Sequence, residues 1–263
     1  MRAETLITRF EQFAPQTLAV PGDPIGLQIG RLDQSVHKVM VTLDVRPEVV
    51  QEAVAAGADM LFAHHPAMFR PVQPFDLAVP QNEMYAECVR HGLLVYAAHT
   101  NLDRATGGMN DWLAAALGLS AVQPFIDDGP EAAMGRIGEL PETMSLAAFV
   151  AQVKTAFSLN GLRVIANDLA RPVRRVAVLG GDGGKFFRAA QSAGADVYVT
   201  GDVYYHTGHD MLAYDLPVID PGHHIEAIMK TQVTALLRQW AQAADWPLTV
   251  VPSQLSTDPF TFM

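Results

Sequence analysis

The chain has 263 residues, of which 49% are hydrophobic and 17% are charged, so its composition is typical of a folded protein and not of a disordered one. Its formal net charge of −10 argues against general nucleic-acid binding, because phosphate backbones are contacted mainly by Lys and Arg. No apolar run approaches the roughly 20 residues that a membrane-spanning helix requires, so we expect no membrane segment.

The first residues and the single cysteine indicate the compartment. The chain begins with an amphipathic stretch interrupted by charges, unlike the apolar core of a signal peptide. Cys88 has no second cysteine with which to form an intramolecular disulfide, and we expect it to be a small buried apolar residue. Both features predict a soluble protein of the reducing cytoplasm.

The first half of the chain alternates between strand and helix patterns. The pattern predicts a helix over 3–13, a Pro/Gly-rich loop over 21–26, a strand over 38–43, a helix from Pro47 to Ala56, a strand over 60–63, a helix over 81–91 and a strand over 93–97. This order is typical of a largely parallel sheet covered by helices.

The second half repeats part of this pattern. A strand is predicted over 175–179, a helix up to Ala193 and a strand over 197–200, and Asp196 lies 137 positions after Asp59. At the same offset, identical counterparts exist for Val39, Val41, Ala53, Ala56, Gly57, Ala58 and Asp59. Either the chain contains an internal duplication, or two ordinary helix-to-strand connections use the same turn chemistry.

The remaining segments complete an α/β fold of two similar lobes with mostly parallel sheets. Residues 127–172 are less regular, with a boundary at 127–130 and a helix over 145–157; a final helix spans about 224–244 and a final strand 247–251. We therefore expect a first lobe over 1–126, completed by 221–263, and a second lobe over 127–220. A dinuclear metal site is expected in the cleft between them.

Histidines and carboxylates gather where the predicted strands end, which is where open α/β sheets bind ligands. The residues at these ends are His64, His65, His99, Asp103, Asp202, His206, His223 and Glu226. The adjacent rings of His64 and His65 can face one pocket where the strand turns, and each can serve a different metal ion. The alternative is one core histidine and one surface histidine.

Two further segments carry ligand chemistry. Asp103 offers a hard anionic oxygen to a divalent ion, and His99 can ligate, orient a ligand, carry a proton or simply be a core residue. His223 and Glu226 are spaced i, i+3, so they share a helical face, as in helical carboxylate metal sites. Helix capping and first-turn electrostatics are the alternative for this last pair.

Glycines follow the strand predicted over 175–179. The segment 180–185 lacks the Ser or Thr of a phosphate-binding P-loop, because Phe186 stands at that position. We expect a tight turn there, although its backbone amides can also cradle an anion. Asp202 and His206 are expected to line the pocket.

These motifs together resemble the family called GTP cyclohydrolase 1 type 2, or Ngg-one-interacting-factor-three-like. The matching segments are residues 23–30, 64–66, 99–103, 200–202 with His206, 222–223 with Glu226, and 257–260. The resemblance implies two metal ions on His64, His65, Asp103, His223 and Glu226, and a homohexameric ring of two-lobed subunits. The length implies the compact form that lacks an inserted domain.

Two functions of different classes remain open. In the first, the chain is a dinuclear metal-dependent hydrolase, in the manner of a GTP cyclohydrolase, acting on a nucleotide or a related small molecule, with His99 or His206 as proton carriers. In the second, the same ligands store, deliver or sense metal without catalysis. The ligand set suits zinc, iron, manganese, cobalt or nickel. A ring that encircles nucleic acid is disfavoured by the net charge.

Overall fold

A computed structural model describes residues 1–127, 129 and 133–263. Contacts between residues divide the chain into two compact units. Unit 1 comprises Met1–Ala105 and Met229–Thr257, and unit 2 comprises Thr106–Ile228 and Asp258–Met263. The boundary motif expected at 127–130 includes residues 128 and 130, which lie outside the described residues.

The contacts divide the chain at 105/106, 228/229 and 257/258, whereas the sequence led us to expect divisions at 126/127 and 220/221 only. Helix α5 (Met109–Ala116) packs against strands of the second sheet, and strand β5 (Ser120–Gln123) pairs with β6 of that sheet. Both elements therefore belong to unit 2, although they precede the expected boundary.

The sheet of unit 1 has the strand order β1-β4-β3-β2-β11. Its strands are β1 (Gly26–Ile29), β2 (Lys38–Thr42), β3 (Met60–Ala63), β4 (Leu94–Ala97) and β11 (Thr249–Pro252). Strands β11, β2, β3 and β4 run parallel, and β1 pairs antiparallel with β4. The expected mostly parallel sheet is thus present in unit 1.

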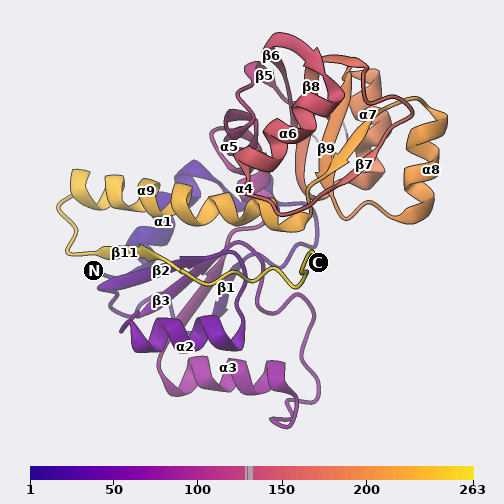
Figure 1. Ribbon diagram of the computed structural model, residues 1–263. Coiled ribbons are helices and arrows are strands. Elements are labelled where there is room, and N and C mark those ends of the chain that lie inside the picture. Colours follow the sequence, from indigo (N-terminus) through magenta and orange to yellow (C-terminus); the bar gives the residue numbers. More distant parts are fainter. Residues whose placement is uncertain (128, 130–132) are drawn as a thin grey trace. The chain divides into compact units, whose positions relative to one another are not determined.

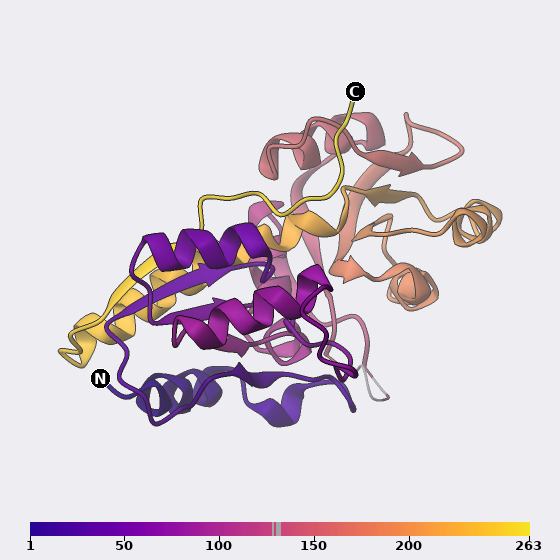
Figure 2. The same cartoon turned by 90° about the horizontal axis from the view of Figure 1, so that it is seen from below.

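Helices cover both faces of this sheet (Figure 1). The helical elements of unit 1 are α1 (Ala3–Phe13), η1 (Gln16–Leu18), α2 (Pro47–Ala55), α3 (Pro80–Arg90), α4 (Thr100–Arg104) and α9 (Ile228–Ala243, whose first residue is assigned to unit 2). Helices α1 and α9 lie on one face, and α2 and α3 lie on the other, where the view from below shows them side by side (Figure 2).

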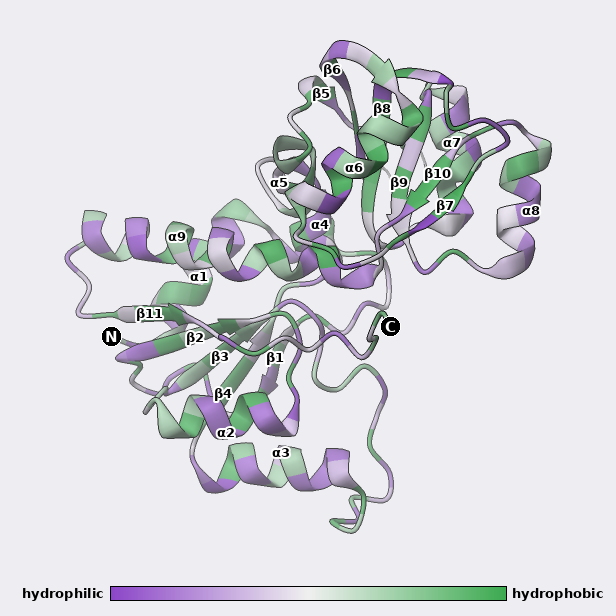
Figure 3. Ribbon diagram, in the orientation of Figure 1, coloured by the Kyte–Doolittle hydropathy of each residue, from purple (hydrophilic) through white to green (hydrophobic). Residues whose placement is uncertain are grey.

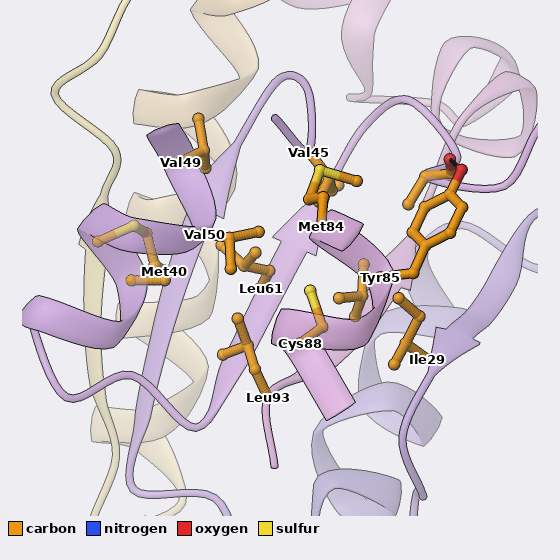
Figure 4. Close-up of a cluster of buried hydrophobic side chains, with 14 residues drawn as sticks. Ile29, Met40, Val45, Val49, Val50, Leu61, Met84, Tyr85, Cys88 and Leu93 are labelled. Carbon is orange, nitrogen blue, oxygen red and sulfur yellow. Dashed lines mark hydrogen bonds between the residues drawn. The ribbon is translucent and has the colours of Figure 1, made fainter. Parts of the chain in front are cut away.

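Alternating side chains of the strands fill both faces. Phe62 of β3 packs on Phe10 of α1, with ring centroids 4.7 Å apart, whereas the neighbouring Leu61 belongs to the core under α2 and α3. In Figure 4, Met84 and Cys88 of α3 lie beside Leu61 in this core. Cys88 is fully buried, as expected for a free cysteine that acts as a small apolar residue.

The sheet of unit 2 has the strand order β5-β6-β8-β9-β10-β7. Besides β5, its strands are β6 (Arg136–Ser145), β7 (Arg163–Ile165), β8 (Pro172–Asp182), β9 (Val197–Gly201) and β10 (Val218–Asp220). Strands β8, β9 and β10 are parallel, whereas β5, β6 and β7 pair antiparallel. This sheet is therefore mixed, although its central strands are as hydrophobic as those of unit 1 (Figure 3).

The other helical elements of unit 2 connect or cover these strands. Besides α5, they are α6 (Leu146–Ala156), η2 (Gly184–Phe186), α7 (Phe187–Ser192), α8 (Tyr205–Ala213) and η3 (His223–Ala227). Within the part of the chain that the structure describes, no helix is both long and apolar enough to cross a bilayer.

The repeated residues occupy equivalent places in the two units. Asp59 Oδ2 accepts hydrogen bonds from two backbone amides at the start of β2, at 2.7 and 2.9 Å, and Asp196 Oδ2 accepts two from the equivalent residues of β8, at 2.9 and 2.8 Å. Gly57 and Gly194 end the preceding helices with φ of +66° and +81°. The helix-to-strand connection is thus the same local structure in both units, which an internal duplication and a shared turn chemistry both predict.

Candidate metal centre

Unit 1 brings three histidines together where parallel strands end. His64 and His65 directly follow β3, and His99 follows β4 at the start of α4. Because the carboxyl ends of parallel strands meet at one edge of the sheet, the three rings become neighbours. Their centroids lie 4.9 to 5.6 Å apart, and one ligand atom from each ring lies within 4.8 Å of the others.

Each of these rings directs Nδ1 at an oxygen. Nδ1 of His64 donates to the carbonyl oxygen of Ala98 at 2.7 Å, and because a carbonyl can only accept, this nitrogen carries the proton. Nδ1 of His65 lies 2.7 Å from Asp44 Oδ1, and Nδ1 of His99 lies 2.9 Å from Asp23 Oδ1. Nε2 is therefore the nitrogen of each neutral ring that can donate a lone pair to a metal.

Asp103 faces the first of these rings. It lies on α4, is 9% exposed, and places Oδ1 3.5 Å from Nε2 of the fully buried His64. With Nδ1 protonated, a neutral His64 presents a lone pair to a carboxylate, and the two acceptors repel each other in a poorly solvated environment. A cation between them removes the repulsion, so these residues fit a divalent metal ion.

Unit 2 repeats this arrangement with other residues. Nδ1 of His223 lies 2.7 Å from Asp202 Oδ2, and its Nε2 lies 3.2 Å from Glu226 Oε2. The segment is a 3-10 helix and not the α-helix that we expected, and residues i and i+3 eclipse each other in a 3-10 helix. Both side chains therefore point the same way from η3, and the buried carboxylate of Glu226 meets the ring directly.

Glycines at the ends of β8 and β9 leave room for these two side chains. A Cβ on Gly180 would lie 2.7 Å from Glu226 Oε1, and a Cβ on Gly201 would lie 2.8 Å from the backbone nitrogen of His223. A Cβ on Gly181, whose φ is +65°, would lie 3.0 Å from Glu226 Oε1. Of the segment 180–185, in which a tight turn was expected, the first residues thus end β8, and a turn begins at Gly183, whose carbonyl oxygen accepts from Phe186 N at 2.9 Å.

Charge and hydrogen bonding favour an ion pair at His99. Burial alone would lower the pKa of His99, but the hydrogen bond to Asp23 and the charge of Asp103 outweigh it and raise that pKa. Burial alone would raise the pKa of Asp23, but hydrogen bonds from His99 and Thr100 and the charge of His99 lower it. The surroundings of His99 therefore favour the protonated form of its ring.

The other predicted proton carrier lies in a different setting. His206 is an exposed side chain in the first turn of α8, edge-on to the ring of Tyr205 at 5.4 Å. Among the described residues, it does not join the groups of side chains whose ligand atoms converge. Asp202, expected to line the pocket, has a more defined place as the hydrogen-bond acceptor of His223.

Sequence reasoning missed two carboxylates, Asp44 and Asp23. Asp44 follows β2 by two positions, so the strand-end rule that found His64 could have included it. Asp23 lies in a loop 76 positions before His99, and no spacing in the sequence connects the two residues.

Comparison with known proteins shows which family this chain resembles. The model of the family Duf34/NIF3 (NGG1p interacting factor 3) matches residues 1–259. A relative from Streptococcus pneumoniae, named GTP cyclohydrolase 1 type 2 homolog, is 43% identical over 264 positions that cover 99% of each chain. A Listeria innocua relative of the same name is 32% identical over 360 positions, with 96% of each chain covered, so it contains residues that this compact chain lacks.

A solved structure agrees over the whole length. The crystal structure of a Bacillus cereus protein related to NIF3 has a TM-score of 0.94 and 31% identity, and the match covers 100% of this chain and 99% of that one. The fold, the order of motifs and the sequence similarity lead to one conclusion. The chain belongs to the Duf34/NIF3 family.

Proposed function

We propose that this protein is a hydrolase that depends on two divalent metal ions, held by His64, His65, Asp103, His223 and Glu226. The observation that carries the proposal is the pairing of each histidine with an oxygen at Nδ1. Metal-binding histidines usually have this second contact, because it fixes the ring and leaves Nε2 for the metal.

The five proposed ligands are imidazole and carboxylate groups, which suit the same divalent ions. When bound, two divalent ions would lower the pKa of a water molecule and polarise the bond to be cleaved.

His99 is the residue to which we assign proton transfer. Asp23 holds its Nδ1, so Nε2 is the atom at which a proton is taken up or released. We favour His99 over His206, because His99 belongs to the histidine cluster of unit 1. Asp23 orients the ring and stabilises its protonated form, in the manner of other histidine–carboxylate pairs.

The proposed substrate is a nucleotide or a related heterocycle. Phe69 is 60% exposed, and its ring centroid lies 6.3 Å from that of His99. An exposed aromatic ring beside a catalytic group can stack on a planar base. Relatives named GTP cyclohydrolase 1 type 2 homolog make GTP the first compound to test, with opening of its imidazole ring as the reaction.

The test is turnover of GTP and other nucleotides by the metal-loaded protein and by a Phe69→Ala variant. We expect the parent to turn over one of them, and the variant to have a raised KM with its metal content unchanged. A metal-loaded parent without turnover on any nucleotide would contradict the hydrolase proposal.

The second candidate is a homohexameric ring that stores, delivers or senses metal. The ligand geometry favours it equally, because fixed histidine rings and buried carboxylates bind metal with or without a substrate. Full metal loading, release to a competing chelator within seconds, and no turnover would favour this function. Light scattering of the purified protein tests the hexamer, which we expect to have the mass of six chains.

A further inference from the structure

The C-terminal strap, residues 253–257, is an irregular segment that follows β11 in unit 1 (Figure 1). It is fixed along its length. Glu52 of α2 accepts hydrogen bonds from the Ser253 hydroxyl and from the Gln254 amide, the latter at 2.8 Å. Lys230 Nζ of α9 donates to the carbonyl oxygen of Leu255 at 2.8 Å. Helices from both faces of the sheet therefore hold the strap in place.

The last residue of the strap reaches a carboxylate beside the histidine cluster. The Thr257 hydroxyl donates to Asp44 Oδ2, while the other oxygen, Oδ1, lies 2.7 Å from Nδ1 of His65. Asp44 thus has a different donor on each oxygen. The side chains of Asp44 and His65 are 28% and 22% exposed, so both hydrogen bonds are partly shielded from water.

We infer that Thr257 and Asp44 are positioning residues, through which the C-terminal strap sets the orientation of the His65 ring and hence the affinity for a metal ion. The inference rests on the proposed function, in which His65 is a ligand. Asp44 keeps the proton on Nδ1, so that Nε2 carries the lone pair. Thr257 donates to Oδ2, which restricts rotation of the Asp44 side chain and so keeps Oδ1 directed at the His65 ring.

This arrangement explains a feature that packing does not. Leu255 is only partly buried, and the strap forms no strand beyond Pro252, so little apolar burial holds it on unit 1. Its contacts are mostly hydrogen bonds in which Lys230 donates or Glu52 accepts, and hydrogen bonds with ionised groups are geometrically strict. Such contacts suit a segment whose task is to place one hydroxyl group accurately.

The experiment compares the parent with Thr257→Val, Thr257→Ser and Asp44→Asn, and with Thr249→Val as the matched control. Valine has the shape of threonine without the hydroxyl, and Thr249 is an exposed threonine of β11. Each metal-free protein is titrated with Co²⁺ alone against a chromophoric chelator. The visible absorption of bound Co²⁺ and the Tm of each metal-free protein are also recorded.

We expect Asp44→Asn to weaken the binding of one Co²⁺ ion about 10- to 100-fold, as loss of a ligand's supporting partner usually does. Thr257→Val should weaken it about tenfold, which corresponds to the loss of one hydrogen bond to a charged group, and should alter the Co²⁺ spectrum. Thr257→Ser should restore the affinity and spectrum of the parent, and Thr249→Val should leave both unchanged.

Unchanged affinity and spectrum in Thr257→Val would overturn the inference, even if its Tm fell, because the strap would then be purely structural. A similar loss in Thr249→Val would overturn it as well, because the effect would then be general. A parent that binds fewer than two Co²⁺ ions would instead count against the proposed function itself. The parent and the variants therefore test the two proposals separately.

Discussion

The two nitrogens of each candidate histidine have separate tasks. Nδ1 of His64, His65 and His223 meets an oxygen at 2.7 Å, and Nε2 of His64 and His223 faces a carboxylate. When the ring is neutral, its Nε2 lone pair and the facing carboxylate repel each other, and in the proposed function the same atoms bind a metal ion. The proposed ligands would then lower the stability of the metal-free chain while they provide metal affinity, an opposition that is common at functional sites.

Glu226→Gln tests this opposition at a single residue. Glu226 is 3% exposed and lies 3.2 Å from His223 Nε2, so a glutamine amide there can donate to the ring where the carboxylate cannot. We expect the metal-free variant to be more stable than the parent by about 1 kcal/mol and to bind metal at least about tenfold more weakly. Chemical denaturation and chelator competition measure the two effects. A metal-free variant less stable than the parent would mean that the pair is not in conflict.

At the scale of elements, the ends of parallel strands supply most of the site. β3 delivers His64 and His65, and β8 and β9 end in glycines that admit the η3 side chains. In each case an apolar run is followed at once by polar residues or glycine. This change of composition is why the sequence pattern predicted where the strands end. The contact of Gly180 with Glu226 was not predictable, because it joins segments that no spacing rule relates.

Gly180→Ala tests the close approach of β8 to η3. Its Cβ would lie 2.7 Å from Glu226 Oε1 and 3.0 Å from Glu226 Cγ, so the Glu226 side chain must move. We expect a loss of about 1–3 kcal/mol in stability and a weakened metal site. Gly184→Ala is the matched control, because the nearest atom to its Cβ would be 3.8 Å away. Equal metal binding by both variants and the parent would show that β8 does not confine Glu226.

Cys88 reports on the packing of α3 against the sheet. The thiol is fully buried, and burial raises its pKa to about 11, so only about one molecule in a thousand carries the thiolate at pH 8. We expect the native protein to resist alkylation at pH 8, and the denatured protein to react with one equivalent of reagent. Rapid stoichiometric labelling of the native chain would contradict the core drawn in Figure 4.

At the scale of the whole molecule, one α/β pattern occurs twice with different chemistry at its strand ends. Asp202 follows β9 at the position, 137 residues later, that His65 has after β3. In unit 1 this position carries a candidate ligand, whereas in unit 2 it carries the acceptor that orients His223. In the proposed function, this position therefore serves metal binding in unit 1 and ring positioning in unit 2.

The sequence predicted unit 1 better than unit 2 for a physical reason. The parallel strands of unit 1 are short apolar runs separated by clear helices, and all were expected near their observed bounds. β6 contains Gly138 and Pro141, which interrupt the alternation of a strand, so its antiparallel pairing with β8 was not expected. The sheet of unit 2 is mixed because of that pairing and the antiparallel pairings of β5 and β7.

The central claim is that five side chains bind two divalent ions, and elemental analysis of the purified protein tests it most directly. The parent would be measured beside His65→Ala and Glu226→Ala, with His206→Ala as a histidine control outside the ligand set. Two metal ions per chain in the parent and in His206→Ala, with a clear loss in the other two variants, is the predicted result. No bound metal in the parent, even after reconstitution with each candidate ion, would contradict the account and leave the histidine cluster as a structural feature.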